Sequence, residues 1–139
     1  MKFPYKKPQV SEIYAPFLPI RVFDETKSFI YPKTGMIETL IDTGYDGFLI
    51  IPLRIFDELK LISSELVEDQ SVRAESITGE YLELQTSMGY VEIPALKLLI
   101  SIEIDTAPFC SEMLIGRQLL EKIVVILNGP THELVVETK

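Results

Sequence analysis

Apolar and polar positions alternate along most of the chain in short runs that turn residues separate, a pattern typical of β-strands. The runs that we assign to strands are residues 12–23, 29–31, 36–41, 48–51, 72–77, 80–85, 90–93, 95–104, 123–127 and 133–136. Thr78-Gly79 and Asn128-Gly129 separate neighbouring runs and predict hairpins, because glycine adopts the backbone conformations that tight turns require. The pattern as a whole predicts an antiparallel β barrel or sandwich.

Two short segments have helical spacing instead. In residues 52–61, Leu53, Phe56 and Leu59 recur on one face, and Pro52 occupies the first helical position, where a missing N–H costs nothing. Residues 117–122 form the second predicted helix. The charged residues 63–70 are interpreted as a solvated connection. Residues 1–10, rich in Lys and Pro, are expected to be a loosely ordered or edge-lying lead-in.

Composition narrows the class of protein. The chain has 139 residues, of which 47% are hydrophobic, so one globular domain over residues 1–139 is expected. The net charge of −8 and the absence of a basic stripe argue against a nucleic-acid partner. No apolar run approaches the roughly 20 residues of a membrane span, and no signal peptide is recognised. With Cys110 as the only cysteine, we expect a cytoplasmic protein that does not associate with membranes.

The candidate chemistry lies where an apolar run ends. Leu40 and Ile41 are followed at once by Asp42 and Thr43 and then by Gly44. This order places a carboxylate at a strand end, where it can point into a cleft while the glycine lets another backbone approach. The alternative is a carboxylate that merely caps a turn, since Asp and Gly favour turns. A second segment downstream, Met-Leu-Ile-Gly-Arg at 113–117, makes the catalytic interpretation the stronger one.

These two motifs and their surroundings, from residue 36 to 136, resemble the retropepsin-like aspartic peptidases, especially their small prokaryotic and archaeal single-domain members. The shared order is Asp-Thr-Gly after an apolar pair, a strand ending in Pro, a short helix, a hairpin, several strands, and Leu-Ile-Gly-Arg before another short helix. The resemblance implies a closed acid-protease barrel with two short helices, completed as a two-fold dimer. Such enzymes activate water between two carboxylates roughly 3 Å apart, and one Asp-Thr-Gly per chain implies a homodimer.

By this resemblance Asp42 is the catalytic residue, one copy acting as general base for water and the other polarising the scissile carbonyl. Thr43 would hydrogen-bond its symmetry mate beneath the pair, and Gly44 would leave room for the substrate. Tyr45 departs from the family pattern, which usually has Ala or Ser after the glycine. Its ring either narrows the cleft or lies outward.

The resemblance also implies a flap and a supporting motif. The flap would close over a peptide bound as an extra strand, with a tip formed by Ser76, Ile77, Thr78 and Gly79. Ile115 and Gly116 would pack under the active-site loop, and Arg117 would begin a helix and tie the fold by ion pairing. The C-terminal strands would join those of the partner in a shared sheet.

The leading hypothesis is therefore an aspartic endopeptidase that cleaves extended segments of peptides or unfolded proteins without metal or organic cofactor. His132, the single histidine, supplies no metal cluster. Cys110 is interpreted as a small apolar residue rather than a nucleophile, and Asp46 as a turn residue. The alternative is a catalytically weak or inactive dimerisation or protein-binding module of the same fold, which Tyr45 and the two acids of the flap hairpin, Glu75 and Glu80, favour. A third hypothesis, a β-barrel subunit of a toxin–antitoxin or regulatory assembly, is supported by no specific feature of the sequence.

Overall fold

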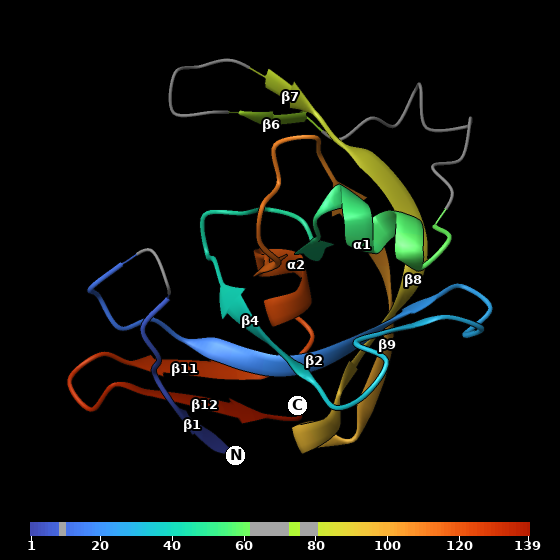
Figure 1. Cartoon of the computed structure of the whole chain (residues 1–139). Coiled ribbons are helices and arrows are strands. Elements are labelled where there is room, and N and C mark those ends of the chain that lie inside the picture. Colours follow the sequence, from blue (N-terminus) through green and yellow to red (C-terminus); the bar gives the residue numbers. More distant parts are fainter. Residues whose placement is uncertain (9–10, 62–72, 76–80) are drawn as a thin grey trace.

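The computed structural model describes residues 1–8, 11–61, 73–75 and 81–139, and within these ranges it is mostly β (Figure 1). The helices are α1 (Leu53–Glu58), α2 (Arg117–Leu120) and a 3-10 turn, η2 (Pro94–Leu96). The strands are β1 (Lys2–Pro4), β2 (Phe17–Asp24), β3 (Ile30–Tyr31), β4 (Ile37–Ile41), β5 (Leu49–Ile50), β6 (Arg73–Glu75), β7 (Tyr81–Glu83), β8 (Gln85–Ile93), β9 (Leu98–Thr106), β10 (Leu114–Ile115), β11 (Val124–Asn128) and β12 (Glu133–Glu137). None of the described helices has the length and apolarity that crossing a bilayer requires.

Six strands close into a barrel in the order β2-β4-β10-β5-β9-β8, and β8 pairs again with β2. Within the barrel β2 pairs with two strands: its first half, Phe17–Ile20, pairs with β4 and its second half, Arg21–Asp24, pairs with β8. Outside the barrel it also pairs with β3. Pro19 lies in the half that pairs with β4 alone, so its missing N–H disrupts no second ladder. Closure leaves the barrel strands without a long open edge.

The barrel is mixed, and the prediction of a purely antiparallel sheet is wrong. β10 runs parallel to β4, and β5 runs parallel to β9. β10 comes from late in the chain and lies between β4 and β5, which are sequence neighbours. The two-residue strand Leu114–Ile115 is too short to give a periodic signal. Its insertion brings the second motif directly beside the first.

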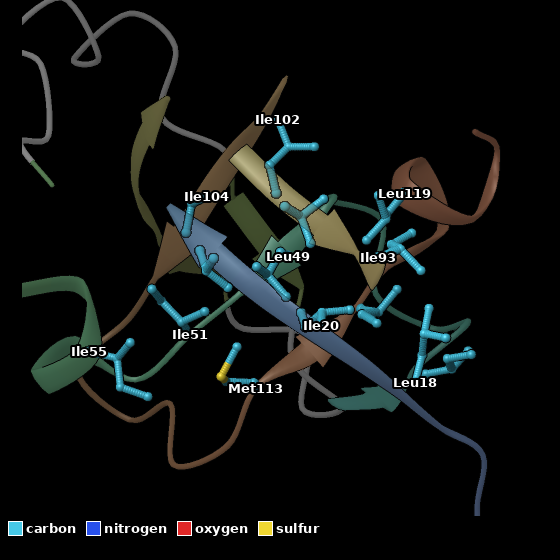
Figure 2. Close-up of a cluster of buried hydrophobic side chains, with 14 of the residues drawn as sticks. Leu18, Ile20, Leu49, Ile51, Ile55, Ile93, Ile102, Ile104, Met113 and Leu119 are labelled. Carbon is cyan, nitrogen blue, oxygen red and sulfur yellow. The ribbon is translucent and has the colours of Figure 1, made fainter. Parts of the chain in front are cut away.

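The core fills the barrel and accounts for the alternating pattern. In β2 every second residue is buried, which places Leu18, Ile20 and Val22 inside. Figure 2 shows Leu18 and Ile20 in one cluster with side chains from across the barrel and from both helices: Leu49, Ile51, Ile55, Ile93, Ile102, Ile104, Met113 and Leu119. Each such aliphatic side chain contributes about 1.5–3 kcal/mol when fully buried. The strands on either side of residues 42–48, β4 and β5, are therefore firmly held.

Both predicted helices are present, in shorter form. α1 begins at Leu53 and not at Pro52, whose carbonyl oxygen instead accepts hydrogen bonds from the Ile55 and Phe56 N–H groups at 3.0 and 3.1 Å. Ile55, Phe56 and Leu59 are buried while Leu53 is exposed, so the apolar face is rotated from the predicted one. The face that packs follows the spacing of three to four residues better than a strict spacing of three.

A separate sheet, β1-β12-β11, joins the two ends of the chain (Figure 1). Within the lead-in, for which a loosely ordered or edge-lying course was expected, Lys2–Pro4 form an edge strand paired with β12. Phe3 packs against the hydrophobic core, opposite Leu134, and this burial orders the segment. The ring of Tyr5 adds to it by stacking on His132 with ring centres 5.7 Å apart.

Candidate functional site

The acidic turn, residues 42–48, begins where β4 ends. The N–H of Asp42 donates a hydrogen bond to the carbonyl oxygen of Ile115 at 2.9 Å, which extends the pairing of β4 with β10. Oδ1 of Asp42 accepts a hydrogen bond from the Gly44 N–H at 2.9 Å. Within the described part of the chain, Oδ2 has no hydrogen-bond partner. One oxygen of the carboxylate thus caps the turn.

Thr43 and Gly44 lie at the exposed tip of this turn. A Cβ at Gly44 would lie 3.2 Å from Oδ1 of Asp42, so glycine at this position avoids a close contact with the carboxylate. The exposed side chain of Thr43 is accessible to a partner molecule, and its bond to a symmetry mate stays a prediction.

The start of α2 holds the acidic turn through its backbone. The first N–H groups of a helix have no partner inside the helix, and here they donate to carbonyl oxygens of the turn. The bonds are Gly116 to Phe48 at 3.0 Å, Arg117 to Tyr45 at 2.9 Å and Gln118 to Gly47 at 3.1 Å. A Cβ at Gly116 would lie 2.8 Å from the Tyr45 carbonyl oxygen, so this approach requires glycine. The structure therefore brings the two sequence motifs together.

The guanidinium of Arg117 forms an ion pair with Asp46 of the acidic turn. Both side chains are exposed, and exposed pairs contribute about 0–1 kcal/mol, so the pair serves mainly to orient the loop. Asp46 was interpreted as a turn residue alone. The sequence contained a signal for this pairing: Arg117 was expected to form an ion pair, and Asp46 is a carboxylate close to the other motif.

The ring of Tyr45 points into the barrel wall and not outward. Its hydroxyl donates a hydrogen bond to Oδ2 of Asp105 at the end of β9, and Thr86 of β8 donates to Oδ1 at 2.7 Å. Asp105 is 2% exposed. Burial raises the pKa of Asp105, although the bonds from Tyr45 and Thr86 oppose the rise. Burial and the nearby Asp105 also raise the pKa of Tyr45, which keeps its hydroxyl protonated as a donor.

Asp105 and Thr86 were missed by sequence reasoning. Each lies one residue beyond a run that was assigned to a strand (80–85 and 95–104), and nothing local distinguishes a buried acid from a surface one. The pairing of β8 with β9 places Thr86 opposite Asp105, and the pairing of β9 with β5 places Asp105 beside Ile50.

A pocket of about 290 Å³ opens beside Tyr45. Its walls are mainly apolar and come from two barrel strands, β5 and β10, from the link between β7 and β8, and from the loop between β9 and β10; they include Ile50, Leu84, Ala107, Cys110 and Leu114. Leu114 precedes Ile115, which binds the Asp42 N–H, so the pocket adjoins the acidic turn. Apolar walls with few polar groups suit an apolar side chain.

A second, larger hollow of about 500 Å³ lies beyond residues 111–112, which line both spaces. Its other walls include Lys6, Lys7 and Glu38. An ion pair joins Lys6 to Glu38 across it. The two spaces thus share residues 111–112 and differ in character: the one beside Tyr45 is mainly apolar, and the larger one is lined by charged side chains.

The predicted hairpin is present at its base. β6 and β7 pair antiparallel, from Arg73 opposite Glu83 to Glu75 opposite Tyr81. Figure 1 shows this pair at the same end of the molecule as the loop between β9 and β10, and β7 leads directly into Leu84 of the apolar pocket. The expected flap tip, Ser76, Ile77, Thr78 and Gly79, lies outside the described residues.

The remaining polar candidates have structural partners. Cys110 is half-buried, its thiol donates to the carbonyl oxygen of Glu112 at 3.0 Å, and burial raises its pKa, which disfavours the reactive thiolate. His132 is exposed and stacks between Tyr5 and Tyr14. Among the described residues, no three His, Cys, Asp or Glu side chains gather as metal ligands would.

Comparison with known proteins connects this geometry to two others. No family model matches the chain. An uncharacterized protein of Archaeoglobus fulgidus is 31% identical over 118 residues, which cover 84% of this chain and 89% of that protein. The structure of EIAV protease in complex with the inhibitor HBY-793 matches 84% of this chain and 92% of its own, with a TM-score of 0.52 and 12% identity. At that identity the likeness shows the fold, and the expected retropepsin-like barrel with two short helices is confirmed.

Proposed function

The chain belongs to the same family as the Archaeoglobus fulgidus protein, and we propose that it is an aspartic endopeptidase that hydrolyses peptide bonds in extended polypeptide segments. One observation carries the proposal: a retropepsin-like barrel presents Asp42 at the carboxyl end of β4, locked by its backbone to β10 and by the following loop to the start of α2.

The chemistry requires a second copy of Asp42. Two carboxylates roughly 3 Å apart cannot both ionise and therefore share one proton. The ionised member removes a proton from water while the protonated member hydrogen-bonds to the scissile carbonyl. Oδ1 of Asp42 accepts a hydrogen bond from the Gly44 N–H, so Oδ2 is the oxygen that would face the water and the scissile carbonyl. A two-fold axis beside the exposed tip at Thr43 supplies the second carboxylate.

The terminal sheet supports self-association and defines where it can extend. β12 is paired on both edges, by β1 and by β11, so a sheet shared with a partner would extend from β1 or β11. This refines the expectation that the C-terminal strands themselves would meet. Of the two edge strands, β11 carries exposed apolar side chains at Val124 (41%) and Ile126 (49%). Burying such side chains favours a dimer despite the net charge of −8 on each copy.

The substrate would lie extended between the acidic turn and the β6–β7 pair. Backbone hydrogen bonds to the edge of that pair would hold the peptide, and side chains would alternate between pockets. The apolar pocket beside Tyr45 suits an aliphatic or aromatic side chain of the peptide. The neighbouring hollow, lined by Lys6, Lys7 and Glu38, suits a polar or charged one.

The test is cleavage of an unfolded protein or a peptide library by purified protein, compared with Asp42→Asn and with Asp57→Asn on the exposed surface of α1. We expect Asp42→Asn to abolish cleavage without changing fold or solution mass, and Asp57→Asn to behave like the wild type. Activity should be bell-shaped in pH, because the pair must be singly protonated. Cleavage that survives in Asp42→Asn would reject the proposal, and an inactive wild type that retains a protein partner would favour a binding module.

A further inference from the structure

The link between Tyr45 and Asp105 ties the acidic turn to the wall of the barrel. We propose that Tyr45 is a positioning residue for Asp42: through its hydroxyl bond to Asp105 it fixes the turn that carries the catalytic carboxylate. The inference rests on the proposed function, but the tether itself can be tested without any catalytic activity.

The anchor is rigid. Asp105 is 2% exposed and belongs to β9, which pairs with β8 on one side and with β5 on the other. Its carbonyl oxygen accepts a hydrogen bond from the Ile51 N–H at 2.9 Å, and its Oδ1 accepts one from Thr86 at 2.7 Å. Backbone and side chain are therefore both fixed before Tyr45 adds its own bond.

The ring of Tyr45 has little freedom on its way to the anchor. A Cβ at Gly116 would lie 2.6 Å from Cδ2 of the ring, and one at Gly47 would lie 2.6 Å from Cζ. The ring thus lies against two glycine backbones, and both also carry hydrogen bonds between the turn and α2. A bulky residue in place of the usual Ala or Ser is accommodated because glycine stands at both contact points.

The backbone transmits the position of the ring to Asp42. The Tyr45 N–H donates to the carbonyl oxygen of Asp42 at 3.2 Å, and the Tyr45 carbonyl oxygen accepts from the Arg117 N–H at 2.9 Å. A displacement of the ring would therefore move both neighbours. A misplacement of about 1 Å in a catalytic group can lower the rate about 100-fold, so a hydroxyl remote from the reacting atoms can matter to turnover.

The experiment compares Tyr45→Phe with Thr86→Val. Both variants remove one hydrogen bond to the same buried carboxylate, but only the first touches the acidic turn. We expect Tyr45→Phe to lower kcat by about 10- to 100-fold with KM little changed, and to displace the limbs of the pH profile. Thr86→Val should lower thermal stability to a similar extent and leave kcat and the pH profile in place. Equal effects of the two variants on kcat, or none from Tyr45→Phe, would overturn the assignment.

Amide hydrogen exchange separates this inference from the proposed function. The Gly44 N–H binds Oδ1 of Asp42 and so reports on the carboxylate directly. We expect its exchange to accelerate in Tyr45→Phe and to stay at the wild-type rate in Thr86→Val. If the wild type cleaves nothing but this difference appears, the peptidase proposal fails and the positioning of Asp42 by Tyr45 stands. Unchanged exchange at Gly44 in Tyr45→Phe would overturn the positioning role, whatever the activity.

Discussion

The N–H of Asp42 donates to the carbonyl oxygen of Ile115 at 2.9 Å, and this bond joins the Asp-Thr-Gly motif at 42–44 to the Met-Leu-Ile-Gly-Arg motif at 113–117. It exists because β10 lies between β4 and β5 and runs parallel to β4. The acidic turn therefore leaves the barrel beside the start of α2, whose unpaired N–H groups bind the carbonyl oxygens of the turn. The position of Asp42 depends on the second motif as much as on its own strand.

Gly116→Ala should unfold more easily than the wild type. The new Cβ would lie 2.8 Å from the Tyr45 carbonyl oxygen, so the turn or α2 must shift. Overpacking of this kind costs about 1–3 kcal/mol in the free energy of unfolding. Chemical denaturation measures the loss, with Gly129→Ala as control, because a Cβ at Gly129 meets nothing within 4 Å. Equal stability of the two variants would contradict the close packing at Gly116.

Asp105 should make the stability of the fold depend on pH. Burial raises its pKa in the folded state above the ordinary 3.8, so the folded protein binds this proton more tightly than the unfolded chain does. The free energy of unfolding should therefore fall as pH rises from 3.8 through the raised pKa. Asp105→Asn, which cannot ionise, should lack this fall.

Denaturant midpoints of the wild type and Asp105→Asn, measured from about pH 3.5 to 7, give the difference in stability that is due to ionisation of Asp105. The stability of the wild type relative to Asp105→Asn should be greatest at acid pH and should decrease toward neutral pH. Two curves that stay parallel over the whole range would mean that Asp105 has the same pKa in both states.

The ion pair between Arg117 and Asp46 should contribute little to stability. Both side chains are exposed, so Asp46→Asn is expected to lower the free energy of unfolding by less than about 1 kcal/mol. Salt screens exposed pairs, and the difference should vanish near 1 M salt. Thermal melts at low and high salt measure it. A loss that is larger, or independent of salt, would show that Asp46 acts through its position in the turn and not through charge.

Local features of the fold could be predicted from the sequence because they depend on neighbouring residues. Alternation located most strands, Asn128-Gly129 located the hairpin between β11 and β12, and the spacing of apolar residues located α1. The insertion of β10 between β4 and β5 could not be derived in this way. It depends on contacts between distant segments, and the two residues of β10 carry no period of their own.

The site was predictable to the same extent. Asp42 was singled out because a carboxylate followed by glycine at a strand end is a recognisable local pattern, and the residues around Gly116 were singled out through the resemblance to retropepsin-like peptidases. Asp105 was not, because its burial depends on which strands flank β9. The direction of the Tyr45 ring depends on Gly47 and Gly116 at once, and only the folded chain brings those glycines together. Ordering of Lys2–Pro4 likewise depends on pairing with the far end of the chain.

The most direct test of the account is an experimental structure of the protein in its solution assembly, read for the separation of the Asp42 carboxylates of two copies. The account predicts a two-fold dimer in which their nearest oxygens lie roughly 3 Å apart, close enough to share a proton. A monomer in solution, or a dimer whose Asp42 side chains face away from each other, would contradict it.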